Sequence, residues 1–394
     1  MRNPVAPVTI LVLTLALIGI GIVMVYSASG ARAGWEQRRI VQSIDAEVVD
    51  EYSHHSPLYL ERQLLWVGVS LAWLMLLVGM DTRWLYRSAP YVAAAVLALL
   101  FLVIATPMGV TSKGATRWLR LGPLAIQPSE FAKPALVLLM ARLLETKREK
   151  ARHLLKGFLP LAATTGIFLG LILAGRDLGT VLVLGTVVFA MWCLARLRAA
   201  HLAGIVVIAI PGLVFALMSH SYRLARIWAF FEPEKFALTT GYQLNQSLIA
   251  VGSGGLIGRG FGEGMQQTHF VPFPYSDFIG STLGEEWGFI GIAGITIAFA
   301  MYALFGFRIA RQARTPFLQL VAVGLTFTTV LTAFLHLGVV IGLLPTTGLT
   351  LPFVSFGRSN LVLTMLFTGI LVNIGSARER VIGSTATNPL AAAA

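Results

Sequence analysis

Residues 8–25 read VTILVLTLALIGIGIVMV and contain no charged side chain. A transmembrane helix needs about 20 consecutive, predominantly apolar residues, and this run approaches that length. Similar runs recur, for example at 63–78 and 322–344. None of them alternates between apolar and polar residues, as the roughly ten-residue strands of a membrane barrel do. The sequence therefore predicts an all-α, polytopic membrane protein.

The composition of the whole chain favours the same class. Hydrophobic residues make up 56% of the 394 residues and charged residues only 12%, whereas a soluble protein carries about 25% charged residues. The single cysteine, Cys193, excludes both an intramolecular disulfide and a cysteine metal cluster.

Ten apolar stretches are predicted to form transmembrane helices, which places both termini on one side of the membrane. The first is longer than the roughly 7–15-residue apolar core of a cleaved signal peptide, and more spans follow, so we expect a retained helix. The domain is predicted to cover 1–375, followed by a disordered tail at 376–394. The predicted helices are 8–27, 63–80, 88–106, 130–144, 157–174, 178–195, 201–218, 278–306, 317–342 and 359–375.

Basic residues predict the orientation of these spans. Lys and Arg are densest at the termini and in the even-numbered connections, most of all in RLLETKREKARHLLK at 142–156. By the positive-inside rule these segments are cytoplasmic, and the connections 28–62 and 219–277 are extracytoplasmic. Topology thus explains the net charge of +12 without a nucleic-acid partner. We expect a multi-pass protein of the cytoplasmic membrane.

The longest polar segment, 219–277, ends in Asp277 at the predicted start of a helix. The helix dipole favours an acid at that place, so capping alone would explain this residue. Within the segment, SYRLARIWAFFEP (221–233) and YQLNQSLIAVGS (242–253) each indicate a short amphipathic piece. A chain so apolar elsewhere leaves little room for soluble chemistry, so we expect its function at this water-facing side.

Charged residues near the predicted spans present open alternatives. Glu130 and Lys133 lie three residues apart on one helix face, where they can pair. Charges inside a span are functional candidates, but a structural ion pair is the alternative. Asp177 is either a helix cap or a site residue. In the preceding outer loop, Arg117 and Trp118 resemble an interfacial segment that contacts an anionic lipid head.

Five stretches resemble, in order, the motifs of the SEDS family (shape, elongation, division and sporulation), which includes FtsW, RodA and SpoVE. The resemblance implies a ten-helix peptidoglycan glycosyltransferase that polymerises lipid II at the outer face of the cytoplasmic membrane. We favour the division branch, typified by FtsW, over the elongation branch, typified by RodA. The stretches are GATRWLRLGPLAIQPSEFAK (114–133), RDLGT (176–180), GYQLNQSLIAVGSGGLIGRG (241–260), SDFIGSTLGEEWGFIG (276–291) and LPTTGLTLPFVSFG (344–357).

The resemblance also implies roles for single residues and a partner. Asp277 matches the family's essential aspartate, and Arg358 departs from the family, in which a glycine is usual. The implied partner is a class B penicillin-binding protein, a transpeptidase, together with other division proteins. Further positions carried over by motif are the helix pair Glu130 and Lys133, and Arg117 and Gln246 near the proposed cavity, while Ser355 of the last motif is added as a substrate contact.

The implied reaction joins a sugar hydroxyl to the anomeric carbon of a second lipid-linked chain. The hydroxyl must lose a proton, and the leaving lipid diphosphate must be neutralised. Asp277 is predicted to act as general base or to bind a divalent cation, Mg²⁺ or Mn²⁺. Charge and side select Lys113, Arg117, Arg223 and Arg259 as candidate diphosphate contacts. A lipid II flippase and a scaffold that positions a synthase remain the alternatives from other classes.

Overall fold

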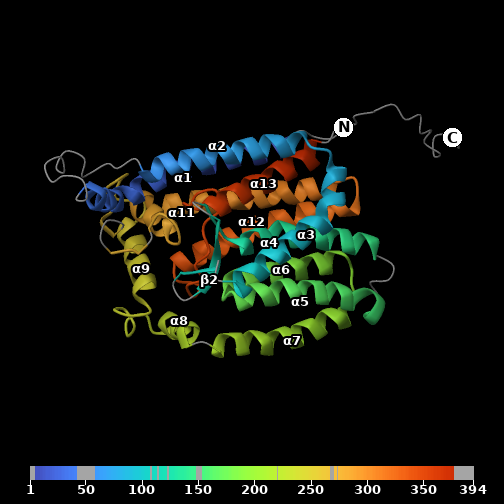
Figure 1. The fold of residues 1–394 in the computed structure, drawn as a ribbon. Coiled ribbons are helices and arrows are strands. Elements are labelled where there is room, and N and C mark those ends of the chain that lie inside the picture. Colours follow the sequence, from blue (N-terminus) through green and yellow to red (C-terminus); the bar gives the residue numbers. More distant parts are fainter. Residues whose placement is uncertain are drawn as a thin grey trace.

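Figure 1 shows the computed structural model of the chain, a bundle of roughly parallel and antiparallel helices with a small sheet at one end. The structure describes residues 5–41, 58–106, 109–112, 115–121, 124–147, 153–219, 221–266, 270–272 and 274–376.

Eight helical segments within these residues are long and apolar enough to cross a membrane, and α6 is a shorter apolar helix. The chain is a multi-pass membrane protein. The helices of the bundle are α1 (Val5–Val41), α2 (Leu58–Gly79), α3 (Thr82–Ala105), α4 (Pro128–Thr146), α5 (Leu159–Ala174), α6 (Leu178–Leu194), α7 (Ala199–Met218), α11 (Ile279–Gln312), α12 (Pro316–Val340) and α13 (Arg358–Ser376). A π-helical turn, η2 (Leu154–Phe158), leads into α5.

The predicted helices lie within a few residues of the observed ones, with one clear exception. The connection 28–62 was predicted to be an outer loop, but α1 continues through it to Val41. This part of the prediction is wrong because the polar residues after Ala28 end the apolar run without ending the helix. Residues 42–57 of that connection and the predicted tail after Ser376 lie outside the described residues.

A three-stranded antiparallel sheet corrects the all-α prediction. Its strands β1 (Gly109–Ser112), β2 (Ala115–Leu121) and β3 (Leu124–Ile126) follow one another in space as in sequence. The register pairs Leu119 with Ile126 and Arg120 with Ala125. In β2, alternating residues point to opposite faces, so Arg117 and Leu119 share a face. Leu119 is buried, which fixes that face against the bundle.

Within the described residues, the long connection between α7 and α11 includes two helices where the amphipathic stretches predicted them. These are α8 (Ser221–Phe231) and α9 (Tyr242–Gly254). Figure 1 places both at the same end of the bundle as β2. The connection, the sheet and the residues before α11 therefore form a cap over one end of the molecule.

A break divides α11 shortly after it begins. Gly288 has φ 65° and ψ −157°, a conformation that L side chains rarely adopt. The backbone groups freed by the break are paired with the glycine-rich segment after α9. The amide of Arg259 donates to the carbonyl of Glu285 at 3.0 Å, and the amide of Phe289 donates to the carbonyl of Gly255 at 2.9 Å. The long connection is thus fastened to the start of α11.

The helices at the centre of the bundle are α12 and α13, whose side chains are mostly buried. By contrast, α7 lies at the edge of the bundle (Figure 1), and Ala216 is its one buried residue among those described. Lipid-facing helices expose apolar side chains because the lipid tails are equally apolar. The start of α1 and the end of α13 meet at the end opposite the cap, where the backbone of Gly375 lies against Pro7.

Candidate active site

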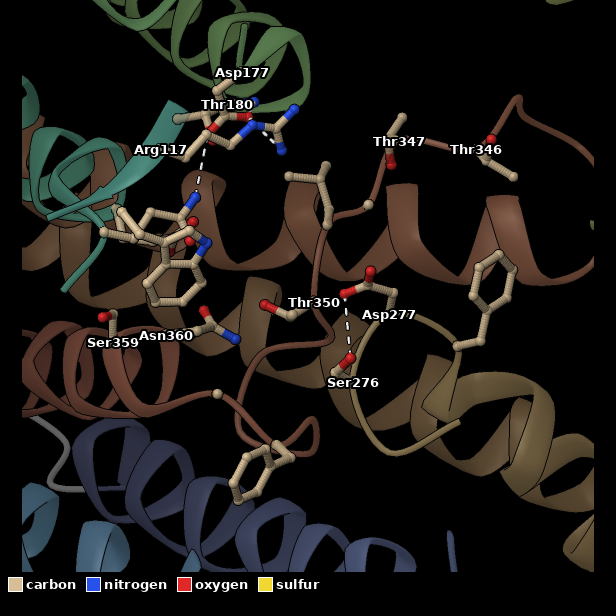
Figure 2. Close-up of a pocket in the computed structure, with 18 of the residues that line it drawn as sticks. Arg117, Asp177, Thr180, Ser276, Asp277, Thr346, Thr347, Thr350, Ser359 and Asn360 are labelled. Atoms are coloured by element: carbon tan, nitrogen blue, oxygen red, sulfur yellow. Dashed lines mark hydrogen bonds and ion pairs between the residues drawn. The ribbon is translucent and has the colours of Figure 1, made fainter. Parts of the chain in front are cut away.

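A cavity of about 360 Å³ lies beneath the cap. Side chains from α4, β2, the start of α6, α8, α9 and α13 reach it, together with the segments 275–278 and 346–350 (Figure 2). The predicted residues that line the cavity are Arg117, Glu130 and Asp277. The other polar lining residues are Gln127, Asp177, Thr180, Tyr222, Arg226, Gln243, Tyr275, Ser276, Thr346, Thr347, Thr350, Arg358, Ser359 and Asn360.

Asp277 stands just before α11, whose first residue is Ile279, and is half-buried at the cavity wall. The hydroxyl of Ser276 donates to its Oδ1 at 3.3 Å. Thr350, labelled in Figure 2, lines the same cavity. Asp277 therefore presents a carboxylate to the cavity, beside the hydroxyl of Ser276, just before the first turn of α11.

Glu130 and Lys133 form the predicted pair. The Lys133 ammonium contacts both carboxylate oxygens of Glu130 at 2.7 Å, and both side chains are buried. Glu130 lines the cavity, whereas Lys133 is absent from the lining among the described residues. The pair thus forms the structural ion pair within α4 and also places one acid at the cavity wall, while its functional role stays a prediction.

Asp177 is both a helix cap and a cavity residue. Its carboxylate accepts from the backbone amide of Thr180 at 3.3 Å, which caps α6. It also accepts from the hydroxyl of Ser129 at 2.8 Å and from the side-chain amide of Gln127 at 3.2 Å. Arg117 stands 3.7 Å away. The carboxylate thereby connects β2, α4 and α6 on one wall (Figure 2).

In α8, the arginine that lines the cavity lies one helical turn after the arginine that was predicted. Arg223 was a predicted contact, but its guanidinium is buried and donates to the carbonyl of Ala216 at 2.6 Å. Arg226, three residues later, lines the cavity and donates to the carbonyl of Thr346 at 3.0 Å. Burial lowers the pKa of Arg226, and the nearby Asp277 carboxylate acts in the opposite direction. Arginine remains cationic under both influences.

In α9 the lining residue is also one helical turn from the predicted one, in the opposite direction along the chain. Gln246 was a predicted cavity residue, whereas Gln243, one turn earlier, lines the cavity. Arg259 lies away from the cavity wall, 3.9 Å from the buried carboxylate of Glu285. That carboxylate also accepts from the amides of Met265 and Gln266. The surroundings of Arg259 therefore hold the long connection on α11, and its role as a substrate contact stays a prediction.

Ser355 is placed as a support for the segment before Asp277. Its hydroxyl donates to the carbonyl of Ser276 at 2.8 Å and accepts from the amide of Leu351 at 2.8 Å. It is fully buried and absent from the described lining. Lys113, the remaining predicted contact, lies outside the described residues.

Several lining residues were missed by the reasoning from sequence. Asn360 and Ser359 open α13 and face the cavity (Figure 2). The sequence feature that could have indicated them is the family motif that ends at Gly357, shortly before them. Arg358 also lines the cavity and adds a cation to that wall. Its departure from the family pattern was the available signal.

The donor set at Asp277 fits one mode of cation binding. Within the described residues, no group of three or more His, Cys, Asp or Glu side chains could hold a metal ion. A dedicated protein cage is therefore not formed there. Mg²⁺ is commonly bound through one or two carboxylates together with water and substrate phosphates. The carboxylate of Asp277, with the hydroxyl of Ser276 beside it, fits this second mode.

A family model described as "Cell cycle protein", named for FtsW, RodA and SpoVE, matches residues 8–380. The "Probable peptidoglycan glycosyltransferase FtsW" of Geobacter metallireducens is 38% identical over 93% of this chain and 94% of its own. "Stage V sporulation protein E" of Bacillus subtilis is 34% identical over 93% of this chain and 95% of its own. Both relatives are similar over nearly their full length.

Solved structures share the same fold. One is a chain of a peptidoglycan synthase complex, described as showing structural coordination of polymerization and crosslinking. It superposes on this chain with a TM-score of 0.74. It is 27% identical and covers 93% of this chain and 96% of its own. The rod shape determining protein RodA of Thermus thermophilus gives a TM-score of 0.66 at 27% identity, over 94% of this chain and 97% of its own.

Proposed function

Since the chain belongs to the cell cycle protein family of FtsW, RodA and SpoVE, we propose that it is a peptidoglycan glycosyltransferase that polymerises lipid II. The observation that carries this proposal is the cavity. It combines the carboxylate of Asp277 with the guanidinium groups of Arg117, Arg226 and Arg358. Glycosyl transfer from a lipid diphosphate needs a proton acceptor and charge neutralisation together.

The cavity belongs, in this proposal, to the outer face of the cytoplasmic membrane. The ten spans of this proposal are the eight long apolar segments together with α4 and the shorter apolar helix α6. The capped end carries the long connection, and the opposite end carries the basic connections, which the positive-inside rule assigns to the cytoplasm. In this proposal both ends of the described chain lie at that cytoplasmic face, and the contact of Gly375 with Pro7 supports their lying at the same end of the bundle.

The reaction forms a bond between the hydroxyl oxygen of one lipid-linked sugar and the anomeric carbon of the other. The bond from that carbon to the diphosphate oxygen breaks, and the lipid diphosphate leaves with the electron pair. Asp277 accepts the hydroxyl proton as general base. A bound Mg²⁺ or Mn²⁺ would instead be held by this carboxylate and would supply charge to the hydroxyl or the diphosphate. Arg117 and Arg226 neutralise the diphosphate.

The partner in this proposal is a class B penicillin-binding protein that crosslinks the new strands. The solved synthase complex with the same fold supports this, because it coordinates polymerization with crosslinking. The similarity to FtsW and to stage V sporulation protein E supports assignment to the septal branch, with cell division as the setting.

The test is glycan-strand formation from purified lipid II by the detergent-solubilised full chain. Wild type, Asp277→Ala and Asp277→Asn are compared, each with and without the cognate transpeptidase and with Mg²⁺ or EDTA. We expect polymer from the wild type and a loss of at least about 10²-fold in both variants, as for a lost general base. Glu263→Gln, an exposed site outside the cavity, is the matched control.

Full polymerisation by Asp277→Asn would contradict the proposed chemistry, because an amide neither accepts the proton nor binds the cation strongly. Absence of polymer from folded, partner-bound wild type under every condition would contradict the enzymatic function itself. Dependence on Mg²⁺ that disappears in Asp277→Asn would favour the cation role over the base role.

A further inference from the structure

A buried histidine lies behind the cavity wall without lining it. His336 is in α12, with 1% of its surface exposed. Its Nδ1 stands 2.8 Å from the carbonyl oxygen of Leu349. Its Nε2 accepts from the backbone amide of Gly280 at 3.4 Å. Both ring nitrogens are thus engaged, and neither partner belongs to α12.

These two contacts fix the state of the ring. A carbonyl oxygen only accepts, so Nδ1 must carry the proton that it shares with Leu349. The amide of Gly280 only donates, so Nε2 must present a lone pair. The imidazole is therefore neutral and held in one tautomer. A protonated ring would set two donors against each other at Gly280.

The two partners belong to two walls of the cavity. Leu349 lies in the segment 346–350, which carries Thr347 and Thr350 into the cavity. Gly280 is in the first turn of α11, three residues after Asp277. His336 consequently connects the 346–350 segment to the first turn of α11, which follows Asp277 closely in the chain.

The close approach at Gly280 depends on the missing side chain. A Cβ there would stand 3.2 Å from Nε2 of His336 and 3.1 Å from a methyl group of Val340. The residue type at 280 and the imidazole at 336 therefore fit each other.

We propose that His336 is a positioning residue, whose neutral imidazole fixes the 346–350 segment and the first turn of α11 at the spacing that the reaction of Asp277 requires. The inference rests on the proposed glycosyltransferase function. A misplacement of about 1 Å at a reacting group can cost as much as 10²-fold in rate. Loss of both contacts should therefore lower kcat more than affinity, because Thr346 is only one of two contacts of Arg226, whose guanidinium also lies over the ring of Tyr222.

The test compares three variants of the full chain. His336→Leu keeps apolar bulk and removes both contacts. His336→Asn places an amide nitrogen near the position of Nδ1 and retains the shorter contact, to Leu349. Thr332→Val is the matched control, since Thr332 lies one turn earlier, is buried, and bonds only to the carbonyl of Thr328 in its own helix.

For each variant we would measure kcat for strand formation, the affinity for fluorescent lipid II, and hydrogen exchange in 274–284 and 346–356. We expect His336→Leu to lose about 10- to 100-fold in kcat, with affinity changed less than about threefold. Exchange should rise in both segments. His336→Asn should recover most of kcat and protect 346–356, and Thr332→Val should match the wild type.

Unchanged kcat and exchange in His336→Leu would overturn the proposal. So would equal losses of kcat and affinity, or a similar loss in Thr332→Val, since those results describe general damage to α12. The exchange measurement does not require activity. If wild type made no polymer, the proposed function would fail while the exchange pattern still tested the contacts of His336.

Discussion

Arg226 is a cavity cation that is held by two contacts. Its guanidinium lies over the ring of Tyr222 at 4.4 Å and donates to the carbonyl of Thr346. These contacts hold the charge toward the cavity without neutralising it. The neighbouring Arg117, paired with Asp177 at 3.7 Å, has less free charge to offer. Of these two arginines, Arg226 is therefore the better diphosphate contact.

Substitution of Arg226 by Gln should weaken lipid II binding. A charge-assisted hydrogen bond contributes about 1.5–3 kcal/mol, so the KM for lipid II should rise roughly 10- to 100-fold. Lys235→Gln serves as the control, because Lys235 pairs with Glu232 at 2.9 Å on an exposed surface and such pairs contribute little. Steady-state kinetics with graded lipid II measure both. An unchanged KM in Arg226→Gln would remove this residue from the substrate site.

Sequence reasoning located the polar positions of the cavity but not their depth. Arg223 was chosen where Arg226 lines the cavity, and Gln246 was chosen where Gln243 does. In both cases the residues are three apart, which on a helix is a similar face and a rise of about 4.5 Å. Motifs indicate a helix face. How far along its axis a helix meets a cavity depends on tertiary packing, which one sequence does not contain.

At the scale of the element, the Glu130–Lys133 pair in α4 has a testable stability. Removing one partner leaves a buried charge, which costs about 3–5 kcal/mol, whereas replacing both is close to neutral. We expect Lys133→Met to lower the thermal midpoint in detergent and Glu130→Gln/Lys133→Met to recover most of the loss. A double variant less stable than the single one would show that the charges contribute individually and not as a pair.

The glycine-rich segment that is joined to α11 contains two glycines with positive φ and different surroundings. Gly258 has φ +83°, and a Cβ there would overlap the backbone of Glu286 and Trp287. Gly262 has φ +78° and open space around it. Gly258→Ala should therefore lower stability clearly more than Gly262→Ala, which pays only the backbone cost of roughly 1–2 kcal/mol. Thermal unfolding in detergent compares them. Equal losses would mean that the joint is loose.

The length of the apolar runs made the membrane spans predictable from the sequence, whereas the sheet could not be predicted. A long apolar run is expected to cross the membrane as a helix, because a helix satisfies its backbone polar groups internally. The positions of α12 and α13 could therefore be predicted from the sequence. The sheet arises in a basic loop punctuated by Gly and Pro. Strands of three to seven residues are too short for a periodic signal. Their pairing depends on contacts such as Leu119 with the bundle.

For the whole molecule, the proposed topology has a direct test. In a Cys193→Ser background, Glu263→Cys and Arg314→Cys place single exposed thiols at opposite ends of the bundle. A membrane-impermeant maleimide should label position 263 in intact cells and position 314 only after permeabilisation. Labelling of 314 in intact cells would reverse the orientation and would place the cavity in the cytoplasm.

The break in α11 has a consequence for the membrane as a physical medium. Residues 289–312, beyond Gly288, rise about 36 Å, enough to cross the roughly 30 Å of hydrocarbon. The turns before Gly288 are joined to this span by a defined bend, so Asp277 sits at a set height above it. Lipid II carries its diphosphate at the level of the headgroups. Bilayer thickness thus becomes a variable of the reaction: longer acyl chains raise the diphosphate toward Asp277, and shorter chains lower it.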